Sequence, residues 1–293
     1  MGAMSSLTFA SLRQAPNPGP MTLDGTNSWL LRGPGSASAV VVDPGPADEG
    51  HLAKIAAAGS IEMIMLTHFH HDHTEGVDRL LELVGDVPVT AADPALCRGI
   101  GPLRDGDRIT AAGVAIEVIA APGHTADSIC LLATFGTERC VCSGDTILGR
   151  GTTVVSWPDG NLADYLVTLD KLSALDGVPV LTGHGPIRPD CGQIAREYRA
   201  HRDERLVQVR AALAAGAQTP SDIVDHVYPD LEAALRPAAE STVRSALAYL
   251  VPGRGQGGDP DSGQSADPER CPSRDPECGP SRAPSVPQTL DPT

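Results

Sequence analysis

The 293-residue chain is poor in aromatic residues and in long apolar runs, and its cysteines are scattered. Because aromatic residues make up only 3% of the sequence, its core must be built from Val, Ile, Leu and Ala. No stretch of about 18 apolar residues is present and no secretion signal opens the chain, so we expect neither a membrane span nor export. Seven cysteines at irregular spacing indicate a reducing compartment. We therefore expect a cytoplasmic protein.

Basic residues are also scarce. The chain has 22 Lys and Arg against 37 Asp and Glu, which gives a formal net charge of −15. Proteins that capture nucleic acid through its phosphates usually carry a basic surface. The charge therefore argues against broad electrostatic capture of nucleic acid, and it favours solubility.

Histidine, in contrast, is concentrated in one place. Four of the nine histidines fall between residues 68 and 73, in the run Thr-His-Phe-His-His-Asp-His that follows the apolar residues 63–66. His68 and His70 are two residues apart, so in an extended segment at a strand end they point to the same side and can share one metal ion. Asp72 and His73 follow a turn and face a second position. The alternative is a solvated polar loop, against which the density of the motif argues.

Three later residues each follow a predicted strand and a glycine. They are His124 after residues 114–120, Asp145 after 139–142 and His184 after 178–181. A glycine directly before the side chain allows a tight turn in which the backbone approaches a buried ion. Each would be an ordinary turn residue if taken alone. Together they repeat one arrangement three times and can complete a site for two ions.

The order HxHxDH followed by His, Asp and His resembles the metallo-beta-lactamase superfamily of dinuclear metal hydrolases, over residues 7–250. The resemblance implies one metal on His68, His70 and His124, and a second on Asp72, His73 and His184. It implies that Asp145 bridges the two metals, and that Asp43 accepts a hydrogen bond that fixes the tautomer of a ligand histidine. Asp72 is also the side chain that we expect to be catalytic. Since the class B beta-lactamases carry Cys or His where this chain has Asp145, hydrolysis of penicillins is not expected.

Strand-like and helix-like segments alternate in two similar halves, which predicts an α/β fold, the αββα sandwich of two packed sheets with helices outside. Helices are expected at 47–58, 74–84 and 162–174, and then at 191–216, 219 onward, 231–235 and 240–250. We expect a metallo-beta-lactamase-like catalytic domain at 1–190 and a helical linker with a winged-helix-like domain at 191–253. Residues 254–293, rich in Pro, Gly and acids, are expected to form a disordered tail.

The closest resemblance is to the beta-lactamase-like protein 2 family, whose animal members are endoribonucleases. Residues 17–22 with 25–27 carry it, together with Tyr198, His201 and Arg202. In the superfamily the first of these loops overhangs the metal site, so Met21 could contact substrate or form part of a plain turn.

The loop 147–159 is expected at the rim of the pocket, where Trp157 could stack on substrate or pack inside the protein. Arg150 in this loop and Arg202, with Arg188 and Arg205, could line a groove that binds RNA. The alternative is that these arginines form salt bridges with nearby carboxylates.

Two metals on His and carboxylate ligands can share a water molecule, lower its pKa toward about 7 and polarise the substrate. We expect two zinc ions per chain, although iron or manganese fits the same ligands. Hydrolysis of single-stranded RNA by a metal-bridging hydroxide is the first candidate function. The second is hydrolysis of a small-molecule thioester, lactone or other ester, as in glyoxalase II, and the third is a binding protein with a degenerate site. His71 could protonate the leaving group or be a solvated bystander, and the oligomeric state stays open.

Overall fold

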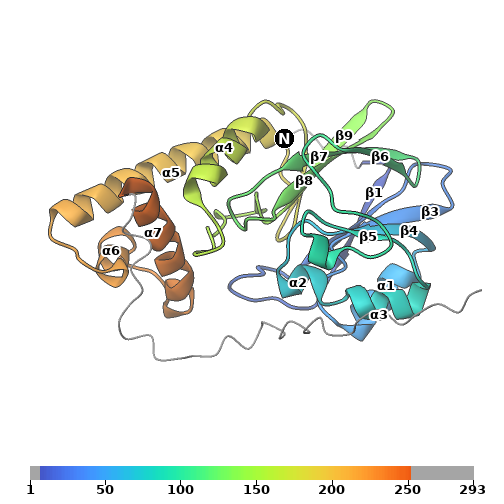
Figure 1. Ribbon diagram of the computed structural model, residues 1–293, viewed down its shortest axis with the longest axis horizontal. Helices are drawn as coiled ribbons and strands as arrows, with labels where there is room; N and C mark the ends of the chain where they lie inside the picture. The colour runs from blue at the N-terminus through green and yellow to red at the C-terminus, as the bar shows by residue number, and fades with distance from the viewer. Residues whose placement is uncertain (1–6, 252–293) are drawn as a thin grey trace, which may run out of the picture. The chain divides into compact units, whose positions relative to one another are not determined.

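Two five-stranded sheets form the centre of the computed structural model, in which residues 7–251 are described (Figure 1). The first sheet contains, in spatial order, β1 (Ala10–Gln14), β2 (Asn27–Leu31), β3 (Ser38–Val42), β4 (Ser60–Met65) and β5 (Val89–Thr90). The second contains β10 (Val180–Thr182), β9 (Glu138–Gly144), β8 (Ile129–Phe135), β7 (Val114–Ala120) and β6 (Arg108–Ala111). Each sheet is mixed, with β3, β4 and β5 parallel in the first and β9 and β10 parallel in the second.

The described residues contain seven α-helices and two short 3-10 helices. They are α1 (Glu49–Ala56), α2 (His71–Thr74), α3 (Val77–Val84), η1 (Pro94–Leu96), α4 (Leu162–Leu172), α5 (Cys191–Ala214), α6 (Pro220–Val227), η2 (Ala233–Leu235) and α7 (Arg236–Leu250). Figure 1 shows α1 and α3 beside β4 and β5. On the described residues, no helix is both long enough and apolar enough to cross a membrane.

The core has three apolar layers, as an αββα sandwich requires. Between the sheets, Trp29 and Val42 of the first pack with Ile116 and Leu131 of the second. Outside the first sheet, side chains of α1 and α3 cover the other faces of β2, β3 and β4. Outside the second sheet, α4 and α5 form a layer that continues into α6 and α7. Aliphatic side chains supply most of each layer, as the composition predicts. The two packed sheets with helices outside them confirm the predicted fold class.

The helix expected at 240–250 begins earlier, at Arg236, and the helix expected at 231–235 is a 3-10 turn, η2. Two further differences concern the first sheet and the helix after the histidine motif. The helix expected at 74–84 is interrupted, because Gly76 donates its N–H to Gly45 O and α3 starts only at Val77. As a result α2 lies inside the histidine motif. Strand β1 was not anticipated; it is an edge strand that pairs antiparallel with β2, and only Ala10 and Leu12 of its five residues are apolar.

The described residues that follow β10 are mostly helical up to Leu250. Helix α6 begins with a capping box, in which the Thr219 side chain accepts from the Asp222 N–H while the Asp222 carboxylate accepts from the Thr219 N–H. The disordered tail expected at 254–293 lies outside the described residues.

The turn after β7 depends on Gly123. Its φ is +144°, and a Cβ atom built there would lie 2.4 Å from Cα of Tyr165 in α4. A side chain at this position would therefore push α4 away from the second sheet.

We predict that Gly123→Ala lowers the free energy of unfolding by about 1 to 3 kcal/mol beyond the backbone strain of a positive φ, because the added methyl group overpacks the contact with Tyr165. The control is Gly136→Ala, at a φ of +59° with no atom within 4 Å of the added Cβ. It should show the backbone strain alone, about 1 to 2 kcal/mol. Urea unfolding of both variants measures the difference, and equal losses would contradict the prediction.

Candidate metal centre

The seven candidate ligands come from four loops, each of which follows a strand. The loop after β4 supplies four of them, and the loops after β7, β9 and β10 supply His124, Asp145 and His184. Side chains of β2 join the two sheets here, since Asn27 and Trp29 both donate to the carbonyl of Thr182 in β10, at 3.0 and 3.1 Å. Five of the seven residues are buried, while His70 and Asp72 are partly exposed.

The first cluster consists of His68, His70 and His124. Nδ1 of His70 lies 3.1 Å from Nε2 of His68 and 3.1 Å from Nε2 of His124. Two nitrogens bound at 2.0–2.1 Å to one tetrahedral zinc ion are about 3.3 Å apart. The three rings thus have a spacing that fits a shared metal ion.

The second cluster consists of Asp72, His73 and His184. Oδ2 of Asp72 lies 3.1 Å from Nε2 of His184 and 3.4 Å from Nε2 of His73. The two imidazole Nε2 atoms are 3.3 Å apart. These donors also have the spacing of a common ion.

Asp145 lies between the clusters. Its Oδ1 is 3.5 Å from Nε2 of His73, and its Oδ2 is 3.3 Å from Nε2 of His184 and 3.9 Å from Nε2 of His124. Oδ1 is buried and has no hydrogen-bond partner among the described residues. Gly183 permits this packing, because a Cβ there would be 2.5 Å from Oδ1. A buried carboxylate oxygen without a donor is unfavourable unless a cation is close, so this geometry fits a carboxylate shared by two ions.

The electrostatics of the site favour neutral rings at His68 and His70 of the first cluster, and positive charge at His73 and His184 of the second. Burial, together with His124, lowers the pKa of His70 to about 4, and burial lowers the pKa of His68 well below its usual value. Burial would raise the pKa of Asp145, but the charges of His184 and His73 hold it well below its usual value. His68 and His70 are therefore in the form that binds metal, and Asp145 carries the charge that attracts it.

Asp43 supports the second cluster from behind. Its backbone is in the left-handed region, with a φ of 54°. Its carboxylate accepts from N–H and Oγ1 of Thr67 at 2.8 and 2.7 Å, and it lies 2.9 Å from Nδ1 of His73. Burial would lower the pKa of His73, but Asp145 and Asp43 raise it well above its usual value, so without metal the ring carries a proton on each nitrogen. A metal that replaces the Nε2 proton would find the lone pair directed at the cluster, because Nδ1–H stays bonded to Asp43.

Further residues contact the candidate ligands, among them Thr67, Thr26 and Val154. Thr67 Oγ1 lies 3.0 Å from Nδ1 of His68, Thr26 Oγ1 donates to Oδ2 of Asp72 at 3.2 Å, and the carbonyl of Val154 accepts from Nδ1 of His124 at 2.7 Å. Sequence reasoning missed all three. The position of Thr67 beside the motif was a usable signal, whereas Val154 acts through its backbone and left none.

Two of the four residues expected to bind substrate are exposed at the surface. Met21 is 50% exposed in the loop before β2, and Arg150 is exposed but forms a two-pronged salt bridge with Asp24, at 2.5 and 2.7 Å. Trp157 is half-buried, and its backbone N–H donates to Oγ of Ser241 in α7. None of the three contacts a candidate ligand through an interaction in the described residues, so their roles stay predictions.

Arg202 does not line an open groove. Its side chain is 3% exposed, its guanidinium donates to the carbonyl of Thr153, and its Cζ lies 5.4 Å from the ring centre of Tyr165. The prediction that it faces RNA is wrong, because its face of α5 packs against α4 and the loop 147–160. Arg188 donates to Gly149 O at 3.1 Å, and Arg205 lies over the ring of Tyr228.

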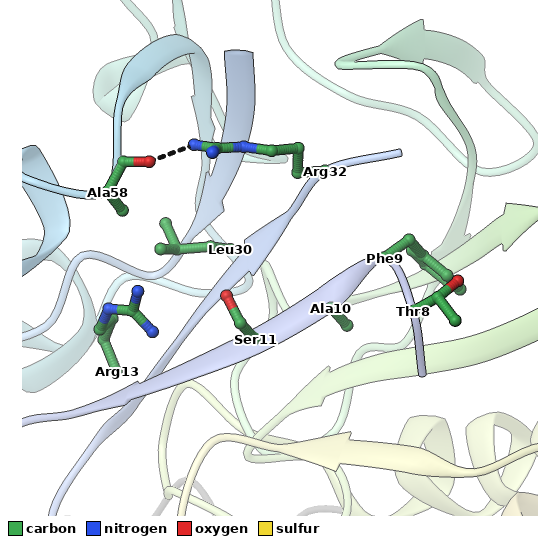
Figure 2. A pocket seen from close by; sticks show the side chains of 8 residues that line it. All are labelled: Thr8, Phe9, Ala10, Ser11, Arg13, Leu30, Arg32 and Ala58. Atoms are coloured by element: carbon green, nitrogen blue, oxygen red, sulfur yellow. Dashed lines mark hydrogen bonds between the residues drawn. The ribbon is translucent and has the colours of Figure 1, made fainter. Parts of the chain in front are cut away.

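A pocket of about 180 Å³ lies elsewhere, along β1 and β2 (Figure 2). Leu30 and two arginines line it, and Arg32 donates to the carbonyl of Ala58 at 2.5 Å. No candidate ligand lines this pocket, so it is not part of the metal centre.

Comparisons with known proteins agree with this geometry. The profile of the Metallo-beta-lactamase superfamily matches residues 21–95 and 98–184, and that of the Beta-lactamase associated winged helix domain matches 219–251. The beta-lactamase-like protein 2 homolog of Caenorhabditis elegans is 34% identical over 247 residues, which cover 80% of this chain and 81% of that protein. An atrochrysone carboxyl ACP thioesterase of Aspergillus fumigatus is 30% identical over 240 residues, which cover 74% and 72%.

Solved structures share the fold. A metallo-beta-lactamase family protein from Thermus thermophilus superimposes with a TM-score of 0.69 at 23% identity, covering 83% of this chain and 93% of that one. A beta-lactamase domain protein from Burkholderia ambifaria gives a TM-score of 0.72 at 22% identity, covering 84% and 87%. At this level of identity the likeness concerns the fold alone.

We predict that the zinc-loaded protein contains close to two ions per chain, and that His68→Ala lowers the metal content as well as any activity, because it removes one of three donors of the first cluster. Elemental analysis after gel filtration measures the content. His226→Ala, an exposed histidine of α6, is the control and should leave it unchanged. If the parent protein binds only one ion tightly, the assignment of two metal sites is wrong.

We also predict that Asp43→Asn weakens metal binding by about tenfold or more, because an amide in place of the carboxylate no longer holds His73 in the tautomer that binds metal. Chelator competition measures the affinity. The control is Asp48→Asn, which retains a good N-cap for α1 and is not among the partners of the histidine cluster. If both variants bind metal alike, Asp43 has no orienting role.

Proposed function

This chain belongs to the metallo-beta-lactamase superfamily, and we propose that it is a dinuclear metal-dependent hydrolase of acyl esters or thioesters. His68, His70 and His124 are the proposed ligands of one divalent ion, and Asp72, His73 and His184 are those of the other, with Asp145 shared. Zinc is the proposed ion, and iron or manganese suits the same donors. When bound, the two ions supply an activated water molecule and polarise the substrate carbonyl.

Asp72 is the proposed catalytic carboxylate. Its side chain is 28% exposed, whereas those of His73 and His184 are 0% and 1% exposed. It therefore reaches both the cluster and the solvent. Burial would raise its pKa, but hydrogen bonding to His184 lowers the pKa to about 2, so the carboxylate is charged at neutral pH. In this state it can orient a water molecule by accepting a hydrogen bond from it.

We favour an ester over RNA as the substrate because the arginines around the site already have partners within the protein. A phosphodiester needs cations near the reacting group, since phosphate contacts supply much of the affinity. Arg150 is paired with Asp24, and Arg202 is buried against Tyr165. With a net charge of −15 for the chain, this leaves little to attract a polyanion.

An apolar side chain is exposed within the metal motif. Phe69, between His68 and His70, is 39% exposed, and Met21 is 50% exposed. An apolar acyl group could pack on such side chains, and a base of single-stranded RNA could stack on Phe69, so they fit both candidates. The fungal relative named as an ACP thioesterase, 30% identical, adds support for thioester chemistry.

Hydrolysis of single-stranded RNA is the second candidate. The winged helix match at 219–251 and the beta-lactamase-like protein 2 relative favour it. It would require Arg150 to exchange Asp24 for a phosphate. Solvent can reach both partners of this salt bridge, because the two side chains are 51% and 50% exposed.

We predict that the zinc-loaded protein hydrolyses neutral acyl thioesters at a rate that changes by less than about twofold between 50 and 200 mM salt, because no counterions are released from such substrates. A thiol-trapping assay measures the rate, and His68→Ala is the negative control. Arg150→Ala should leave this activity unchanged.

The same preparation is tested on single-stranded RNA. Cleavage that weakens steeply with salt and is lost in Arg150→Ala, without thioester turnover, would contradict the first proposal and favour the second. If neither class is turned over by the metal-loaded protein, both proposals fail.

A further inference from the structure

The loop 147–160, which we call the rim loop, holds the ring of His124. The carbonyl of Val154 accepts a hydrogen bond from Nδ1 of His124 at 2.7 Å, and Thr153 Oγ1 lies 3.2 Å from the same nitrogen. The N–H of Ser156 donates to the carbonyl of His124 at 3.0 Å. Both the ring and the backbone of this candidate ligand are therefore fixed by the rim loop. Its Nδ1 contacts leave Nε2 directed at the first cluster.

Helix α5 holds the rim loop at two points. The Arg202 guanidinium donates to the carbonyl of Thr153, the residue next to Val154. Tyr198, one turn earlier, donates from its hydroxyl to Gly151 O at 2.7 Å and accepts from the N–H of Leu148 at 3.2 Å. Both side chains are buried, so these bonds are shielded from water.

Arg202 also packs on α4. Its guanidinium lies over the ring of Tyr165, with Cζ 5.4 Å from the ring centre. The hydroxyl of Tyr165 donates at 2.8 Å to the carbonyl of Thr146, the residue after Asp145. Nε of Arg202 is buried without a partner among the described residues. Burying a cation in this way is unfavourable, so a purely structural core position would be better filled by an apolar side chain.

Helix α7 holds the rim loop from the other side. Oγ of Ser241 accepts from the N–H of Trp157 at 2.7 Å and donates to Val155 O at 3.2 Å. The helices that follow His184 thus contact the rim loop at each end and in the middle. Tyr198, Arg202 and Ser241 bond to this loop and not to the candidate ligands themselves.

We propose that the C-terminal helices are a positioning element of the metal centre, in which Tyr198, Arg202 and Ser241 hold the rim loop so that Val154 orients His124. This inference rests on the proposed ligand role of His124. It gives the Tyr198 and Arg202 motif a function that does not involve nucleic acid. Residues that orient a ligand histidine from outside typically contribute tenfold to a hundredfold to metal affinity.

The test compares metal binding by the full-length protein and by Arg202→Met. The expected result is a loss of about tenfold in affinity for one of the two zinc ions, with the other unchanged, because only the first cluster contains His124. Chelator competition measures both affinities, and the visible spectrum of the cobalt-substituted protein reports the geometry of each site. Arg202→Lys should restore most of the affinity, since its ammonium group can donate to Thr153 O.

The matched control is Arg199→Met on the same helix. Arg199 forms a salt bridge with Asp170 of α4 at 2.8 Å and does not contact the rim loop. It tests whether any weakening of the contact between α4 and α5 changes metal binding. Arg199→Met should bind two zinc ions as the parent does, and an equal loss in both variants would overturn the proposal.

A double-mutant cycle identifies the path of the effect. If Arg202 acts through His124, adding Arg202→Met to His124→Ala should cause no further loss of metal, whereas independent effects would add. Additive losses, or normal metal binding in Arg202→Met, would overturn the inference. If His124→Ala itself keeps two ions, the failure lies in the ligand set of the proposed function instead.

Tyr198→Phe is the second variant, in case Arg202→Met does not fold. It removes only the hydroxyl that holds Gly151 and Leu148, and it keeps the packing of the ring. It should weaken the same zinc ion and show the same absence of additivity with His124→Ala. A folded Tyr198→Phe protein with parental affinity for both ions would overturn the proposal.

Discussion

The buried carboxylate of Asp145 is the constraint on which the rest of the site depends. It lies among three imidazoles, and one of its oxygens has no donor within the described residues. Such a charge is tolerated in a protein interior only when positive charge is close. The histidine clusters on its two sides therefore have to be held at the spacing of metal ligands. Two hydrogen bonds fix these rings, since Nδ1 of His73 donates to Asp43 and Nδ1 of His124 donates to the carbonyl of Val154.

The fold supplies the backbone for this arrangement. The segments that follow β4, β7, β9 and β10 meet at the metal centre. The hydrogen bonds from Asn27 and Trp29 to Thr182 join the two sheets there. The aliphatic layer between the sheets makes the two halves one rigid support. A ligand set drawn from four loops can then keep its geometry, because each loop is anchored at a strand end.

The same packing decides which charges are available to a substrate. Arg150, Arg188, Arg202 and Arg205 all belong to the segments around the site, yet each has a partner within the protein. Arg188, Arg202 and Arg205 are not free to bind phosphate while they keep these contacts, and Arg150 is free only if it leaves Asp24. This is the reason why we propose a neutral acyl substrate, and not a polyanion, for this metal-dependent hydrolase.

The sequence by itself determined the αββα fold class, most helices and strands and the seven residues that converge on the centre, because strand alternation and the HxHxDH spacing are local patterns. It did not reveal the edge strand β1 or the break at Gly76, since both depend on partners distant in the chain. Nor did it show that Val154 holds His124 through a backbone carbonyl, which has no side-chain signature. Whether Arg202 faced a groove or the interior was decided by how α5 packs on α4 and the rim loop. Residue type and spacing specify which groups can bind a metal, but only long-range packing decides which charges remain free to meet a substrate.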